Sequence, residues 1–276
     1  MLNCPICKSN ATFKFVSKLR KNVYQCESIK CSHLFVDDYL SSSGICDRGE
    51  EIEEIRKQWQ KRIDTYRIRN INLYKKIFEK LNLTENAKVL DFGSGDGYAM
   101  YHLRSFYPKV DITCIEPNKL TIQFINKAAN KVVDSIDQLN EKYDLIFMNE
   151  VIEHLDSPIQ HLQALSKLLK DENSAMYIAT PLGEADNESY ETSAYNDISH
   201  LHFFTRKSLN LSLIQSGFTP LDVNDINDPL YYFSTNSSIK FKLKKIIFNI
   251  IKNKLLNVFY VLPKTHISGL AYKNQM

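Results

Sequence analysis

The 276-residue chain lacks several features that would place it in a special class. No apolar run is long enough to span a bilayer, because asparagines and lysines interrupt the longest candidate, Ile246 to Leu262. The first residues lead into cysteines rather than into the apolar segment of a secretory signal. Internal repeats are absent, and a net charge of +3 is too small to indicate a nucleic-acid partner by itself. We therefore expect a globular protein of the cytoplasm, where thiols stay reduced.

Five of the six cysteines lie within residues 1–47. Two residues separate the first pair of cysteines, and four residues separate the second pair. Four thiolates from two loops suit a tetrahedral, structural zinc ion, and a core this small could hardly fold without such a staple. The alternative is a set of reduced buried thiols; in the zinc interpretation His33 could replace a cysteine, and Cys46 is a spare. The predicted zinc ligands are Cys4, Cys7, Cys26 and Cys31.

Two segments of the chain are basic. No acid occurs from Met1 to Gln25, whereas basic residues lie between the cysteine pairs, among them Lys14, Lys18, Arg20 and Lys21. They form either a patch for phosphorylated sugars or RNA, or a solvated face. Residues 238–262 interleave lysines with Ile, Leu and Phe. This pattern predicts an amphipathic helix that either covers the sheet or contacts the anionic inner face of the membrane.

Strands and helices are expected to alternate in the middle of the chain. From about Glu50 to Leu83, apolar residues recur at three- and four-residue steps, which predicts one or two helices. Apolar strands are then expected at Lys88–Phe92, Asp111–Glu116, Lys131–Asp134, Tyr143–Asn149, Ser174–Thr180 and Phe218–Val223. Helices are expected at Tyr98–Phe106, Asn118–Asn130, Ser157–Leu169 and Thr205–Ser216, with Asn118 and Ser157 as caps. His266 to Tyr272 is expected as a last edge strand.

This alternation predicts an α/β protein with a doubly wound, Rossmann-like, mostly parallel seven-stranded sheet. The expected division is a zinc-ribbon-like module over 1–47 and a helical connector over 48–84. A cofactor-binding domain follows over 85–235, and a basic helix and last strand occupy 236–276.

The strongest local motif is the segment from Val89 to Gly97, in which a strand runs into a loop with three glycines at alternate positions. Glycines there let the backbone approach a ligand. Asp91 precedes the loop, Asp96 lies within it, and both would repel a dinucleotide pyrophosphate. S-adenosylmethionine instead carries a sulfonium and an ammonium, which favour carboxylates. Glu116, at the end of the next strand, can accept hydrogen bonds from two ribose hydroxyls.

Together these motifs carry a family resemblance. Val-Leu-Asp-Phe-Gly-Ser-Gly-Asp-Gly from Val89, then Ile-Glu-Pro from Ile115, then Tyr-Asp-Leu-Ile from Tyr143 with Glu-His-Leu from Glu153, resembles class I methyltransferases. The resemblance covers roughly Leu83 to Val223 and implies that Asp91, Gly93, Gly95 and Glu116 contact S-adenosylmethionine, with Asp134 or Ser135 near the adenine. The predicted cofactor-binding residues are Asp91, Phe92, Gly93, Ser94, Gly95, Gly97, Glu116, Pro117, Asp134, Ser135 and Asn149.

The candidate catalytic residues follow the fourth and fifth strands of the predicted sheet. Glu150, Glu153 and His154 would share one helical face through their spacing, and His200 and His202 form a second group. One hypothesis makes a histidine the general base for an acceptor hydroxyl. A second makes the group a site for Mg²⁺ or another divalent ion, because Glu-x-x-Glu-His resembles metal-using quinone-pathway and small-RNA O-methyltransferases. A third gives Glu153 and His154 only a structural role.

The predicted function is methyl transfer from S-adenosylmethionine to a hydroxyl or carbon of a small molecule. Similar cysteine modules occur in bacterial methyltransferases of sugar and cell-surface glycan pathways, so this resemblance implies a sugar or glycan intermediate as acceptor. An RNA methyltransferase and a metal-dependent quinone or lipid O-methyltransferase are the alternatives. A module that binds the cofactor without turnover and a nicotinamide dehydrogenase are less favoured.

Overall fold

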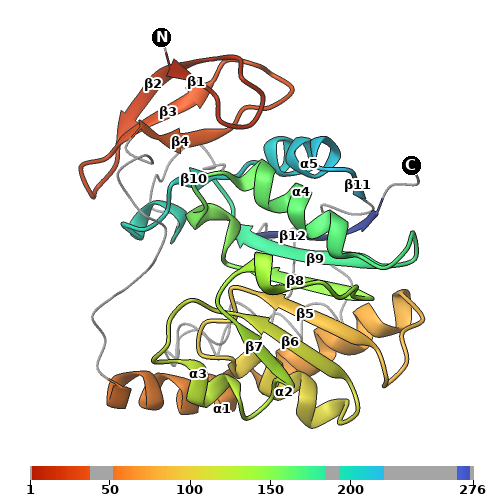
Figure 1. The fold of residues 1–276 in the computed structure, drawn as a ribbon. Coiled ribbons are helices and arrows are strands. Elements are labelled where there is room, and N and C mark those ends of the chain that lie inside the picture. Colours follow the sequence, from red (N-terminus) through yellow and green to blue (C-terminus); the bar gives the residue numbers. More distant parts are fainter. Residues whose placement is uncertain (1, 38–51, 184–192, 221–265, 274–276) are drawn as a thin grey trace, which may run out of the picture.

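The computed structural model describes residues 2–37, 52–183, 193–220 and 266–273 (Figure 1). The predicted basic helix of residues 238–262 and the spare Cys46 lie outside these described residues. Among the helices within the described ranges, none is long and apolar enough to cross a membrane.

A seven-stranded sheet forms the centre of the molecule, with the strand order β11-β12-β9-β8-β5-β6-β7. The five strands from β9 to β7 run parallel, whereas β12 is antiparallel to both of its neighbours. This arrangement confirms the predicted α/β class with a mostly parallel sheet. The strands are β5 Lys88–Phe92, β6 Asp111–Ile115, β7 Lys131–Val133, β8 Leu145–Asn149, β9 Ala175–Pro181, β11 Phe218–Pro220 and β12 His266–Lys273.

The prediction that the last strand lies at the sheet edge is wrong. β12 pairs with β9 along seven residues and with β11 on its other side, so β11 is the edge strand. The burial pattern gives the reason. The successive residues Ile267 and Ser268 are buried, as are Leu270 and Ala271, so both faces of β12 are covered, as in an interior strand.

Helices cover both faces of the sheet (Figure 1). One face packs on α1 (Ile52–Lys80), α2 (Tyr98–Phe106) and α3 (Ile122–Ile125), which share a core cluster that includes Tyr74, Met100 and Ile125. The other face packs on α4 (Pro158–Leu168) and α5 (Arg206–Gln215). The segment predicted as one or two helices before the first sheet strand is the single 29-residue helix α1.

One predicted helix start differs in the structure, and one predicted cap lacks its hydrogen bond. The expected helix Asn118–Asn130 contains only the short α3, because the Asn118 side chain accepts the backbone N–H of Leu120 and holds a local turn instead. Ser157 precedes α4, but its side chain makes no capping hydrogen bond; Pro158 occupies the first turn as expected.

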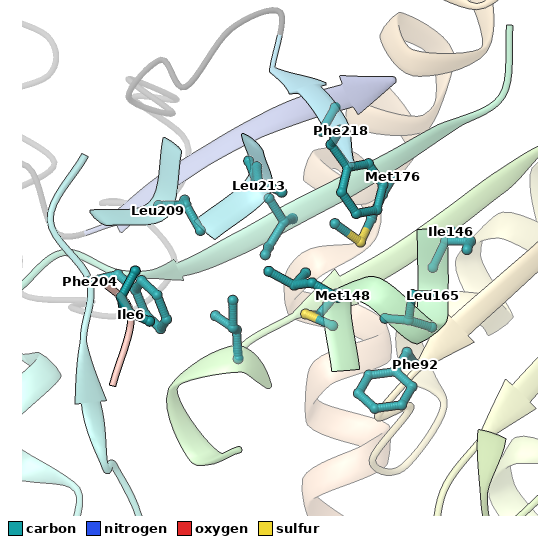
Figure 2. Packing of buried hydrophobic residues seen from close by; sticks show 14 of the residues in the cluster. Ile6, Phe92, Ile146, Met148, Leu165, Met176, Phe204, Leu209, Leu213 and Phe218 are labelled. Atoms are coloured by element: carbon teal, nitrogen blue, oxygen red, sulfur yellow. The ribbon is translucent and has the colours of Figure 1, made fainter. Parts of the chain in front are cut away.

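The N-terminal module is a small antiparallel sheet of β1 (Leu2–Asn3), β2 (Asn10–Val16), β3 (Asn22–Cys26) and β4 (Leu34–Val36). Its fifth strand, β10 (His202–Phe203), comes from far along the chain and pairs with β4. Ile6 of the module belongs to the same core cluster as Phe204 and Leu209 (Figure 2). The module therefore shares its core and its sheet with the larger domain.

Candidate functional site

The glycine loop joins β5 to α2. Gly93, Gly95 and Gly97 all have positive φ, a region that other residues rarely adopt. A Cβ added at Gly93 would lie 2.5 Å from Cγ2 of Val151, so this glycine allows close packing. A Cβ at Gly95 would meet nothing within 4 Å, so the loop backbone there faces open space. The loop therefore leaves room for a ligand at the carboxyl end of β5, where ligands of open α/β sheets bind.

Two carboxylates flank this open space. Asp91 is 4% exposed, and its burial raises the pKa of its carboxyl to about 7. Glu116 follows β6, and its two oxygens accept the backbone N–H groups of Gly95, at 2.7 Å, and Asn118, at 2.9 Å. Each carboxylate oxygen has a second lone pair, so Glu116 is oriented by the chain and can still accept hydrogen bonds from a ligand.

Arg62 is a site residue that the sequence analysis missed. Its Nη1 donates to Oδ2 of Asp96 at 2.7 Å, and Oδ1 of Asp96 accepts the N–H of Tyr98. Arg62 thus offsets the Asp96 charge, so of the two acids expected to repel a pyrophosphate only Asp91 has no cationic partner among the described residues. The sequence does contain a signal for Arg62. It lies three residues after the buried Trp59, so both share the face of α1 that packs against the domain.

The other predicted cofactor residues lie at the same edge of the sheet. Phe92 and Asn149 end β5 and β8, Pro117 follows β6, and Asp134 and Ser135 follow β7. Because the carboxyl ends of parallel strands meet at one edge, these residues lie along the edge that bears the glycine loop. The Ser94 hydroxyl, within the loop, donates to the Asp91 carbonyl at 3.0 Å.

The candidate catalytic residues gather beside this loop, in part as predicted. Glu153 and His154 lie on the 3₁₀ turn η3 (Ile152–His154), and His200 approaches them from the segment before β10. Oε1 of Glu153 is 3.9 Å from Nε2 of His154 and 4.0 Å from Nε2 of His200. Within the described residues, this buried Oε1 has no hydrogen-bond partner, while Oε2 accepts the Thr180 hydroxyl at 2.8 Å.

Backbone carbonyls determine which ring nitrogens carry protons. Nδ1 of His154 is 3.2 Å from the carbonyl of Ser199, and Nδ1 of His200 is 2.7 Å from the carbonyl of Ala194. A carbonyl only accepts, so both Nδ1 atoms donate, and in the neutral rings each Nε2 presents a lone pair toward Glu153. Burial and the neighbouring His200 lower the pKa of His154, which favours its neutral ring. Burial, with Glu150 as a second cause, raises the pKa of Glu153 well above its usual range.

Two parts of the catalytic prediction need correction. Glu150 and Glu153 do not share a helical face, because Glu150 adopts a φ of 54° after β8 and only the short η3 turn follows. The structure also places His202 outside the group. Its Nε2 bonds the Leu155 carbonyl at 2.9 Å and its Nδ1 contacts Nε2 of His33 at 3.1 Å, so both nitrogens have protein partners.

The four predicted zinc ligands come together in the module. Their sulfur atoms all lie within 4.8 Å of one another. The Sγ atoms of Cys4 and Cys31 are 3.8 Å apart, and those of Cys7 and Cys26 are 3.3 Å apart. A tetrahedral ion with zinc–sulfur bonds of about 2.3 Å requires sulfur atoms about 3.8 Å apart, so the arrangement fits zinc. His33 takes no part in this cluster; its Nδ1 contacts the Ser208 hydroxyl at 3.1 Å.

Comparison with known proteins assigns the family. A family model described as "Methyltransferase domain" matches residues 46–223. The chain belongs to this family. Membership confirms the predicted enzyme class, an S-adenosylmethionine-dependent methyltransferase, and the matched range includes the glycine loop and the Glu153–His154–His200 group.

The relatives of this methyltransferase include RNA-modifying enzymes. The small-subunit ribosomal RNA methyltransferase G of Mesoplasma florum is 28% identical over 137 residues, which are 43% of this chain and 57% of that protein. The chain thus matches little more than half the length of this relative. The tRNA U34 carboxymethyltransferase of Aliarcobacter butzleri is 27% identical over 225 residues, 71% of this chain and 73% of that protein.

Solved structures show the fold. Coclaurine N-methyltransferase bound to N-methylheliamine and SAH has a TM-score of 0.51 at 13% identity, covering 74% of this chain and 72% of that one. The [4+2]-cyclase SpnF gives the same TM-score at 13% identity, covering 74% and 80%. Because a cyclase and a methyltransferase match equally well, this likeness supports the fold but does not identify a substrate.

Proposed function

We propose that this methyltransferase transfers a methyl group from S-adenosylmethionine to a hydroxyl or carbon of a small molecule, with a sugar or cell-surface glycan intermediate as the first candidate. The observation that carries the proposal is the polar group of Glu153, His154 and His200 beside the glycine loop. Val151, next to this group, packs against Gly93 of the loop. Cofactor and acceptor would thus lie on adjoining surfaces.

The residues of the loop fit S-adenosylmethionine, which supplies an activated methyl group when bound. Asp91 and Glu116 offer carboxylates to a cofactor that carries an ammonium and vicinal ribose hydroxyls. The open space at Gly95 gives the cofactor access to the loop backbone. Asp134 or Ser135 would lie near the adenine, and Phe92, Ser94, Gly97, Pro117 and Asn149 would complete the surface around it.

The group of Glu153, His154 and His200, here called the acceptor edge, can take part in proton transfer. Nε2 of His154 or His200 can take the proton of an acceptor hydroxyl, because the Nδ1 of each donates to a fixed carbonyl. The lowered pKa of His154 keeps its ring neutral and its Nε2 unprotonated. The exposed fraction of the His154 side chain, 21%, gives it access to an acceptor, whereas that of His200 is only 8%. His154 is therefore the better candidate for the base.

The same three residues also suit a divalent ion such as Mg²⁺, which is a second proposal for this edge. Oε1 of Glu153 and the Nε2 atoms of His154 and His200 lie within 4.8 Å of one another. A buried carboxylate oxygen without a partner, facing two imidazole lone pairs, is the donor set of a metal site. Titration with Mn²⁺, followed by electron paramagnetic resonance, tests it: a Glu153→Gln variant should lose any tight binding seen in the wild type.

RNA is the alternative acceptor, and two observations favour it. The hairpin of β2 and β3 exposes Phe13, and its basic residues include Lys14, Lys18 and Arg20. Lys21 at the same hairpin donates to the carbonyl of Ile198, two residues before His200. An exposed aromatic ring and basic side chains on a hairpin that contacts the segment before His200 suit a single strand. The named relatives also act on ribosomal RNA and tRNA.

Zinc would hold the cysteine module together, as a structural ion bound by Cys4, Cys7, Cys26 and Cys31. The hydrogen bond between Cys4 and Cys31 lowers the pKa of Cys4 to about 6 and raises that of Cys31, so a bound ion would have to displace the proton that the pair shares. Contact of residues 238–262 with the inner face of the membrane, and a cytoplasmic location, stay predictions.

The first test is calorimetric titration with S-adenosylhomocysteine, beside the Glu116→Ala variant and with NADH as control. Saturable binding that weakens in the variant supports the cofactor site, whereas NADH binding in its place would overturn it. Transfer of labelled methyl from S-adenosylmethionine is then compared between nucleotide-sugar and tRNA pools. Label in RNA alone would replace the sugar proposal with the alternative. If the His154→Ala variant labels both pools as well as the wild type does, the group of Glu153, His154 and His200 has no role in catalysis.

A further inference from the structure

The cysteine module is joined to the acceptor edge by a continuous set of hydrogen bonds. The N–H of Val36, in β4, donates to the carbonyl of Leu201 at 3.1 Å, and the N–H of Leu201 donates to the carbonyl of Glu153 at 2.8 Å. Thr205, which caps α5, donates its hydroxyl to the carbonyl of Cys31 at 3.0 Å. The backbone that carries Glu153 is therefore bonded through one residue to the module.

His33 stands at the centre of this junction. It is fully buried, and its ring packs 5.3 Å from that of His202 and 4.8 Å from that of Phe204. Its Nε2 contacts Nδ1 of His202 at 3.1 Å, and Nε2 of His202 reaches the carbonyl of Leu155, at the end of η3, at 2.9 Å. Two imidazoles thus connect the module to the turn that bears Glu153 and His154.

The partners fix the proton positions along this chain. The Leu155 carbonyl only accepts, so Nε2 of His202 donates and its Nδ1 must accept in the neutral ring. Nε2 of His33 therefore donates to His202, and Nδ1 of His33 accepts from the Ser208 hydroxyl. Both rings are Nε2–H tautomers. His154 and His200, bonded to carbonyls through Nδ1, are the opposite tautomer.

We propose that His33 is a positioning residue for methyl transfer, which holds the His200–Phe203 segment and the η3 turn in the geometry that brings His200 and His154 to Glu153. The cysteine module then helps to hold the residues of the acceptor edge in place. The inference rests on the proposed function only in treating this edge as the acceptor side, and its test needs no turnover.

The supporting contacts all converge on one short segment. His202 pairs with Phe35 and Phe203 with Leu34 in the β4–β10 ladder, which has only these two register positions. A ladder this short is weak alone, because a two-stranded pairing in water is marginal even when longer. The buried His33–His202 contact adds a side-chain constraint to the backbone bonds of Leu201, and it needs both a donor and an acceptor on the residue at position 33.

The test uses the full-length zinc-loaded protein and long-range ¹H–¹⁵N spectra of its histidine rings. In the wild type, we expect Nε2–H signals for His33 and His202 and Nδ1–H signals for His154 and His200. In His33→Leu, we expect the signals of His154 and His200 to shift or broaden. Loss of one buried hydrogen bond should also speed amide exchange at Leu201 about tenfold. Binding of S-adenosylhomocysteine should stay unchanged.

Two further variants separate positioning from loss of stability. His33→Gln can still donate to His202 and should restore most of the wild-type ring signals. His102→Leu removes another buried histidine, which contacts Asn70 and Ile63 on the opposite side of the sheet, and should leave the signals of the acceptor edge unchanged. Equal changes in the His33 and His102 variants would overturn the proposal, as would unchanged His154 and His200 signals in His33→Leu. If His33→Leu fails to fold, the same spectra are recorded for Ser208→Ala, which removes the hydroxyl that Nδ1 of His33 contacts.

Discussion

Asp91 gives a stability prediction with a defined sign. Burial raises its pKa to about 7 from the ordinary 3.8. The folded state therefore favours the neutral carboxyl, and ionisation costs stability as the pH rises from about 4 through 7. The difference between the two pKa values corresponds to roughly 4 kcal/mol above about pH 8. Without cofactor, the protein should thus be less stable at pH 8.5 than at pH 5.5 by a part of this amount.

An Asp91→Asn variant tests this reasoning, because the amide keeps the shape and removes the charge. Urea unfolding at half-unit intervals from pH 4.5 to 8.5 should show the variant gaining stability on the wild type as the pH rises, toward roughly 4 kcal/mol. The variant should also bind S-adenosylmethionine less tightly, since it lacks the carboxylate. Parallel pH profiles for the two proteins would refute the raised pKa of Asp91.

Three other predictions concern the loop and the module. Gly93→Ala should lower the free energy of unfolding by about 2 kcal/mol or more, because the new Cβ would lie 2.5 Å from Val151 and φ is +76°. Gly95→Ala, at an open position, should lower the free energy of unfolding by about 1 kcal/mol. Thermal unfolding measures both, and an equal loss in the two variants would contradict the close contact at Gly93. Arg62→Ala should weaken S-adenosylhomocysteine binding by roughly tenfold, because it leaves the Asp96 charge without its cationic partner; calorimetry showing wild-type affinity would exclude this role. Metal analysis should find one zinc per chain in the wild type, and Cys7→Ser should lower the melting temperature more than the buried control Cys114→Ser; zinc-free wild-type protein of full stability would contradict the site.

Local patterns predicted the sheet and the loop well. β5 and α2 begin and end at the expected residues, because an apolar run meets glycines and an amphipathic segment follows directly. Glu116 lies beside Gly95 as the order of strands β5 and β6 requires. Such features depend on residues that are neighbours in sequence or on adjacent parallel strands. The periodicity of apolar residues and the order of the strands can be read from the sequence, so both kinds of feature are predictable.

Features that depend on distant partners could not be predicted in this way. β10 is only two residues long, and its pairing with β4 joins positions far apart in the chain. His200 and His202 look equivalent in sequence, yet one faces Glu153 and the other faces His33. Arg62 gains its role only when α1 packs over the loop. Tertiary packing decides each of these cases, and no local periodicity records it.

The position of β12 affects how the chain is made. β9 and β11 both leave the ribosome before β12, which must then enter between them. Until residues 266–273 are synthesised, β9 presents an unpaired edge of seven buried residues, a surface that invites pairing with other chains. The nascent protein therefore depends on a late segment to close its sheet, and a chain that stops before His266 should aggregate rather than fold with one strand fewer.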